Sequence, residues 1–196
     1  MTFLRTRTYI KQLRRLLVAL MLFTFCTSAK AQLFVVSSEV TSDLLLAPSL
    51  GLEIVTGNRS SVSVNALITN GLLGKDFKLT AIQPEYRYWF SGRPINKWFV
   101  GAGAIGAIFD VKHKGKVYDG YGFGAGITYG YVWNVTERLS IDFHSGFGAF
   151  FYTRKEYFEQ DNYDVDYTEN GVQRANATGY YLLPTRIGVS VSYILK

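Results

Sequence analysis

"DGYGFGAGITYGYVWN" (residues 119–134) alternates glycine with aromatic and aliphatic residues along its length. Successive side chains of a β-strand point to opposite faces, so this period of two predicts a strand with one small face and one apolar face. A dinucleotide-binding loop needs GxGxxG between a strand and a helix, and nothing helical is predicted after this stretch. The stretch therefore predicts one wall of a larger sheet, not a phosphate site.

The same alternation recurs along the chain and predicts eight strands. Every second connection is a compact turn, and the longest loop, residues 153–179, lies among the other connections, which include a loop over 111–118. Short periplasmic turns, longer outer loops and an even strand number are typical of outer-membrane barrels. The predicted fold class is all-β, an eight-stranded antiparallel up-and-down transmembrane β-barrel. Its expected strands cover residues 33–41, 49–56, 61–69, 79–90, 97–110, 121–133, 138–152 and 180–195.

Two prolines lie inside expected strands. Pro84 and Pro184 each lack the N–H that a strand donates to its neighbour, and a closed barrel has no free edge to tolerate the loss. We therefore expect each proline to mark a bulge or a strand end.

The N-terminal residues have the pattern of a secretory signal peptide. Five basic residues precede an apolar segment at 16–25, and Ala29 and Ala31 form a small-x-small cleavage site. A ten-residue apolar segment is too short for a membrane-spanning helix, which needs about 20 residues. We expect residues 1–31 to be a cleaved signal peptide and residues 32–196 to be the outer-membrane β-barrel domain.

Removal of that peptide changes the charge balance. It carries six of the 21 Lys and Arg residues and none of the 15 Asp and Glu residues, so the mature chain is neutral, 15 against 15. The net charge of +6 therefore gives no reason to expect a nucleic-acid partner. The single cysteine, Cys26, leaves with the peptide, so no disulfide is expected.

Aromatic residues indicate which face meets which environment. A membrane barrel shows its apolar face to lipid, whereas a soluble barrel hides it inside. Two aromatic belts, one at each end of the strands, fit two membrane interfaces, so we expect an outer-membrane location, contact with lipid and lipopolysaccharide, and a monomer. The belt near the short turns comprises Trp89, Phe90, Trp98, Phe99, Tyr131 and Trp133, and the belt near the longer loops comprises Tyr121, Phe151, Tyr152, Tyr180 and Tyr181.

Four stretches spread over the mature chain carry a family resemblance: "APSLGLEI" (47–54), "IQPEYRYWF" (82–90), "GYGFGAGITYGYVW" (120–133) and "LPTRIGVSVSY" (183–193). With these stretches the chain resembles a family of small Bacteroides-type outer-membrane β-barrels catalogued as a domain of unknown function. The resemblance implies an eight-stranded barrel of the general OmpA or OmpX kind. It implies no activity, no cofactor and no catalytic residue.

Strand parity places six charged side chains on the inner face of the barrel. An eight-stranded barrel is filled by its own side chains, and an unpaired buried charge costs several kcal/mol. We therefore predict an ion-pair network that plugs the lumen, with a narrow channel as the alternative, and we expect the glycines of 119–134 to leave room for Arg and Tyr side chains. The predicted network comprises Glu53, Glu85, Arg87, Asp142, His144 and Arg186.

A lipid A-modifying enzyme is a second alternative, suggested by His144 beside Ser145. Adjacent strand residues face opposite ways, so these two cannot act as base and nucleophile. The only other histidine, His113, lies in an expected outer loop. We predict no enzyme, no cofactor and no metal site.

The longest expected loop, 153–179, is rich in acidic residues interleaved with tyrosines. It lacks the glycine and the spaced glutamate of an EF-hand loop, so Ca²⁺ binding stays an open alternative. Long loops on rigid scaffolds commonly carry binding residues. We predict a non-enzymatic barrel whose outer loops contact lipopolysaccharide, a surface protein or a glycan. The outer-loop residues are Glu156, Glu159, Asp161, Asp164, Asp166 and Glu169.

Overall fold

The computed structural model describes residues 33–69, 71, 77–160, 168–169, 172–173 and 177–195. The chain divides into two compact units, Met1–Gln32 and Leu33–Lys196, and every described residue belongs to the second unit. The expected signal peptide lies outside the described residues. In the described part of the chain, no helix has the length and apolar character needed to cross a membrane.

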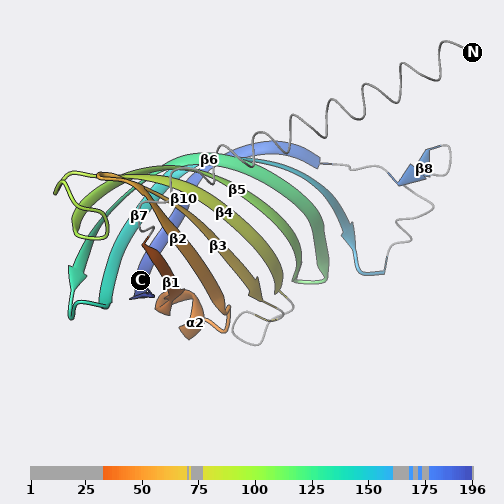
Figure 1. Cartoon of the computed structure of the whole chain (residues 1–196). Helices are drawn as coiled ribbons and strands as arrows, with labels where there is room; N and C mark the ends of the chain where they lie inside the picture. The colour runs from red at the N-terminus through yellow and green to blue at the C-terminus, as the bar shows by residue number, and fades with distance from the viewer. Residues whose placement is uncertain are drawn as a thin grey trace, which may run out of the picture. The chain divides into compact units, whose positions relative to one another are not determined.

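Eight antiparallel strands form a closed barrel in the order β1-β10-β7-β6-β5-β4-β3-β2 (Figure 1). Neighbours in the barrel are neighbours in the chain, apart from β1, which closes the ring on β10. The predicted all-β, eight-stranded antiparallel up-and-down architecture is confirmed. The barrel strands are β1 (Phe34–Glu39), β2 (Ser49–Gly57), β3 (Ser60–Thr69), β4 (Phe77–Trp89), β5 (Lys97–His113), β6 (Lys116–Asn134), β7 (Leu139–Phe158) and β10 (Ala177–Ile194).

The smaller elements lie in two of the longer connections. A short helix, α2 (Val40–Leu44), joins β1 to β2. Between β7 and β10, the two-residue strands β8 (Thr168–Glu169) and β9 (Val172–Gln173) pair antiparallel with each other.

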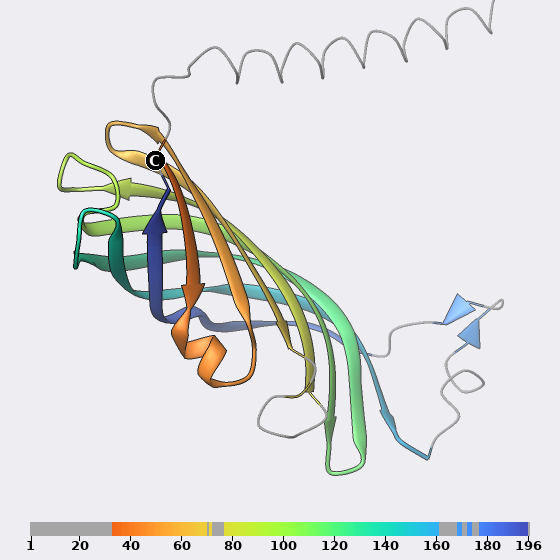
Figure 2. The same cartoon turned by 60° about the horizontal axis from the view of Figure 1, so that its bottom comes forward.

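The strands on one side of the barrel are longer than the sequence predicts. The expected loop 111–118 is wrong, because β5 and β6 are joined by Lys114 and Gly115 alone. Both residues have positive φ (51° and 77°), as in the two-residue turns that commonly connect the strands of a β-hairpin. The expected loop 153–179 is also too long, since β7 continues to Phe158 opposite Lys116 of β6. These strands extend past α2 and the ends of β2 and β3 (Figure 2). We call residues 111–118 and 153–158 the outer extension.

The two prolines behave differently. The register between β10 and β7 shifts between Pro184 and Arg186, so the predicted bulge is confirmed there. Because of this bulge, Tyr181 lies on the inner face, where its ring stacks on Tyr152, and not on the outer face as the unbroken alternation suggested. The expectation of a bulge or a strand end at Pro84 is wrong, because Pro84 lies inside β4. The β4–β5 pairing is interrupted beside Pro84 but resumes in the same register, so the missing N–H is tolerated without an extra residue.

An apolar cluster fills the barrel at the end that carries the short turns. It comprises Val35, Trp89, Ile95, Phe99 and Val132. Trp89 and Phe99 are 0% and 1% exposed, so their predicted place in an aromatic belt is wrong. Adjacent strand residues face opposite ways, so the neighbouring aromatic residues, Phe90 and Trp98, face outward instead.

Candidate functional site

A buried cluster of charged side chains lies inside the barrel beyond the apolar cluster. All six residues of the predicted network are at most 8% exposed. Arg87 lies at the centre: its Nη1 is 3.2 Å from Glu53 Oε2 and 3.0 Å from Asp142 Oδ2, and its Nε is 3.0 Å from Glu85 Oε2. One guanidinium from β4 thereby links carboxylates of β2, β4 and β7.

A second group of contacts extends the cluster toward the other end of the barrel. Arg186 Nη1 is 3.0 Å from Glu85 Oε2, and Arg186 Nε is 3.8 Å from Glu39 Oε1. His144 Nε2 lies 2.7 Å from Glu39 Oε1, whereas its Nδ1 is 3.6 Å from Asp142 Oδ1, too far for a hydrogen bond. The structure thus brings all six residues into one network with Glu39, and we call these seven residues the charge cluster.

Glu39 is the member of the charge cluster that the sequence did not predict. Strand β1 alternates poorly, because Ser37 and Ser38 interrupt the apolar pattern. The pairing of β1 with β10 indicates that Glu39 faces the interior. Glu39 is directly opposite Ser190, which is 2% exposed, and directly opposite residues share a face. Counting every second residue onward from the buried Val35 also places Glu39 inside.

Glycines next to the charge cluster provide space for its side chains. A Cβ at Gly188 would lie 2.6 Å from Glu39 Oε1, and one at Gly130 would lie 2.6 Å from two ring carbons of Phe99. The Phe99 ring in turn packs against the Arg87 guanidinium, 4.5 Å from centroid to Cζ. Larger residues at these positions would displace the groups that hold the cluster.

The glycines at 124 and 126 have a different role from the one predicted. Instead of leaving room for Arg or Tyr side chains, they allow β6 to lie close to β7. A Cβ at Gly124 would be 2.5 Å from the carbonyl oxygen of Ala149, and one at Gly126 would be 2.7 Å from that of Phe147.

The charge cluster combines acidic and basic side chains. Four carboxylates meet two guanidiniums and one imidazole, and Ser61 donates a 2.5 Å hydrogen bond to the remaining oxygen of Glu53. His144 lies inside, whereas Ser145 shares an outer row with Tyr129 and Ile187, directly opposite it on the flanking strands. Across the described ranges, no group of three His, Cys, Asp or Glu side chains could hold a metal ion.

Two of the six predicted outer-loop acids lie at the outer end of β7, where both form ion pairs. Glu156 accepts hydrogen bonds from Lys116 Nζ (2.9 Å) and Arg154 Nε (2.6 Å), which lower the pKa of its carboxyl from the ordinary value. Glu159 pairs with Lys112 at 2.9 Å. Three of the other four, Asp161, Asp164 and Asp166, lie outside the described residues. The fourth, Glu169, lies in β8, and only its backbone is described.

Comparison with known proteins gives a family and no activity. A family model described as "Protein of unknown function (DUF3575)" matches residues 17–195. The chain belongs to this family. No curated protein and no solved structure gives a significant match. DUF3575 membership confirms the resemblance to a domain of unknown function.

Proposed function

We propose that this DUF3575 chain is a monomeric, non-enzymatic outer-membrane β-barrel, exported by a signal peptide at residues 1–31. Its interior is plugged by side chains, and its outer end contacts lipopolysaccharide, with a surface protein or glycan as the alternative contact. It needs no cofactor in this role.

The observation that carries this proposal is the reversed distribution of polarity. Phe123 and Ile127 are 66% and 63% exposed on the outside of the barrel, whereas Arg87 and Glu85 are 3% and 2% exposed inside. A water-soluble barrel buries apolar side chains and exposes charge. The arrangement found here suits lipid outside and a polar interior.

The height of the apolar surface supports the same conclusion. Outward-facing residues on β6 run from Tyr121 to Trp133, twelve residue steps. At about 3.4 Å per residue and a strand tilt of about 40°, this span is roughly 30 Å high, close to the thickness of a bilayer's hydrocarbon core.

Aromatic rings gather at both ends of this surface. Near the short turns, Trp98 contacts Tyr131 edge-on with centroids 4.9 Å apart. Near the other end, Phe151 lies between Phe123 (5.7 Å) and Tyr180 (6.1 Å). Two such belts are typical of the two interfaces of a membrane.

The interior supports a plugged barrel over a channel. From the turn end inward, the apolar cluster and then the charge cluster occupy the interior, with side chains linked across it by Arg87. An eight-stranded barrel has little more room than its own side chains need.

The outer extension and the tyrosines next to it support the contact role. Arg154 lies between two tyrosines, with its Cζ 5.1 Å from the Tyr118 centroid and 4.5 Å from that of Tyr152, and Tyr152 stacks on Tyr181 at 4.9 Å. Pre-ordered aromatic and basic side chains suit the sugars and phosphates of a lipopolysaccharide surface.

Membrane insertion is tested by a charge on the outer face. We expect the wild-type protein in the outer-membrane fraction, with heat-modifiable migration on a denaturing gel. Ile127→Arg, midway between the two belts, should lose about 2–4 kcal/mol of stability in liposomes because Arg is costly at the bilayer midplane. Urea unfolding followed by tryptophan fluorescence measures this loss.

The matched control is Val135→Arg, at an exposed site in the turn after β6, where we expect a cost of about 0–1 kcal/mol. Equal stability of Ile127→Arg and Val135→Arg, or recovery of the wild type from the soluble periplasm, would contradict membrane insertion.

The outer contact is tested by photo-crosslinking on live cells. A benzophenone amino acid at Glu159, which is exposed beyond the end of β7, should capture lipopolysaccharide or a surface molecule. The same residue at Glu137, exposed in the turn between β6 and β7, should capture neither, because that turn lies at the opposite end of the barrel. Capture of the same molecules from both positions would refute the proposed orientation.

A further inference from the structure

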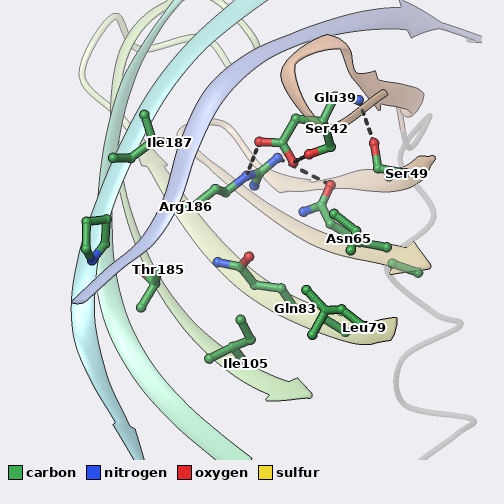
Figure 3. A pocket seen from close by; sticks show the side chains of 15 residues that line it. Glu39, Ser42, Ser49, Asn65, Leu79, Gln83, Ile105, Thr185, Arg186 and Ile187 are labelled. Atoms are coloured by element: carbon green, nitrogen blue, oxygen red, sulfur yellow. Dashed lines mark hydrogen bonds and ion pairs between the residues drawn. The ribbon is translucent and has the colours of Figure 1, made fainter. Parts of the chain in front are cut away.

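A cavity of about 310 Å³ lies inside the barrel on the outer side of the charge cluster (Figure 3). Its lining comes from the end of β1, from α2, and from β2, β3, β4, β5 and β10. Ligand pockets generally start at about 300 Å³, so this space is large enough for a small molecule. The proposed contact role of the outer extension does not use it.

The floor of the cavity presents hydrogen-bond donors. Asn65 accepts a hydrogen bond from Arg186 Nη2 through Oδ1 (3.4 Å), which leaves its Nδ2 buried and without a partner in the described structure. The amide of Gln83 and the hydroxyl of Thr185 line the same space (Figure 3). A buried donor without an acceptor costs about 1–3 kcal/mol, so this floor favours a ligand with acceptor oxygens.

The acceptor on the same floor is already engaged. Glu39 receives hydrogen bonds from His144 and Ser42 and lies 3.8 Å from Arg186. The charge cluster, to which Glu39 belongs, holds four carboxylates against two guanidiniums and one imidazole. A ligand with a further negative charge would add to this excess, so a neutral acceptor such as an ester carbonyl fits best.

The wall toward the outer end is apolar. Leu67 precedes the outer end of β3 by two residues, Leu79 and Ala81 lie near the outer end of β4, and Ile105 lies beside Gln83 (Figure 3). Burial of an alkyl chain against such a wall gains about 25 cal/mol per Å² of apolar surface. The cavity therefore has a donor-rich floor and an apolar upper wall.

Access to the cavity is from the outer end. Leu79, Gln83 and Ile105 are partly exposed. The next two inward residues of β4 after Gln83 are Glu85 and Arg87, and both are buried. Among the described residues, the cavity is thus open above the charge cluster and closed below it.

We propose that this cavity binds a small amphipathic acyl compound with a neutral carbonyl head. The carbonyl oxygen accepts hydrogen bonds from Asn65, Arg186 and Gln83, and the acyl chain packs against Leu79 and Ile105. The volume holds roughly ten water-sized groups at about 30 Å³ each, which matches a chain of medium length. This site rests on the interior geometry alone and goes beyond the surface contact proposed above.

Photolabelling with a diazirine-bearing methyl octanoate tests the proposal on the folded protein in lipid nanodiscs. We expect mass spectrometry to find label on the inward residues Leu79, Ala81 and Ile105. A probe that merely dissolves in the lipid would label the outward residues Ile82 and Ile108 instead. Label on outward residues alone would overturn the proposal.

A matched pair of variants on β5 separates binding inside from binding outside. Ile105→Trp fills the cavity and should lower inward labelling at least about tenfold, equivalent to about 1.4 kcal/mol of binding. Ile108→Trp makes the same change on the outer face and should leave inward labelling unchanged. If Ile105→Trp does not give the folded, heat-modifiable form, Leu79→Trp replaces it. Unchanged inward labelling in a folded cavity-filling variant would also overturn the proposal.

The floor is tested with Asn65→Leu. We expect this variant to reduce inward labelling by the ester while labelling by a diazirine-bearing octane, which has no carbonyl, stays the same. The free acid should label the wild type more weakly than its ester at neutral pH. Equal loss for ester and alkane, or stronger labelling by the acid, would refute the neutral carbonyl head.

Discussion

Arg87→Met is expected to prevent stable folding of the barrel. The substitution keeps much of the side-chain volume but leaves Glu53, Glu85 and Asp142 without the guanidinium that lies 3.0–3.2 Å from each of them. Removal of one partner from a buried ion-pair network costs about 3–5 kcal/mol, because the remaining charges stay buried and uncompensated. The loss should appear in urea unfolding in liposomes and as a missing heat-modifiable form.

Two further variants show whether the buried carboxylates cause this loss. Arg59→Met removes the same charge from the exposed turn between β2 and β3 and should cost less than about 1 kcal/mol. Combining Arg87→Met with Glu53→Gln, Glu85→Gln and Asp142→Asn should restore much of the stability, since neutral amides cost less to bury than carboxylates. Wild-type stability of the single variant Arg87→Met would show that Arg87 does not hold the interior together.

The six residues of the predicted network could be assigned to the interior because two simple constraints agree. Period-two alternation defines two faces for each strand, and in the proposed lipid-facing barrel only the interior can satisfy charge on the polar face. Arg87 and Asp142 are 55 positions apart, yet each lies on the polar face of its own strand. Parity within each strand was enough, and no knowledge of the register between strands was required.

The sequence did not predict features that depend on register or on long-range packing, such as the change of face beyond Pro184, where a bulge or a strand end was expected. The bulge at Pro184 moves Tyr181 to the other face, since one extra residue reverses the alternation beyond it. The outer extension adds strand residues at positions where charged side chains on neighbouring strands pair, such as Lys116 with Glu156. The cavity combines residues 39–42 with four central strands and β10, and the sequence alone does not bring these segments together.

Gly124→Leu should disrupt the contact between β6 and β7 strongly. Even a Cβ at this position would lie 2.5 Å from the carbonyl oxygen of Ala149 and 3.1 Å from Cγ2 of Ile105, so the two strands must separate. Overpacking of a closely packed interior commonly costs about 1–3 kcal/mol, and we expect about 3 kcal/mol here because backbone must move. The folded fraction after refolding into liposomes, measured by heat-modifiable migration, reports this cost.

Ala125→Leu is the matched control for this prediction, because it introduces the same side chain one residue further along β6. Ala125 is exposed on the outer face, so in the proposed membrane barrel the added side chain meets lipid and should change stability by less than about 0.5 kcal/mol. The contrast between neighbouring positions depends only on which face each residue occupies. If Gly124→Leu assembled normally and Ala125→Leu did not, the inner and outer faces of β6 would be reversed. The stretch 119–134 would then line a soluble barrel with its aromatic side chains inside.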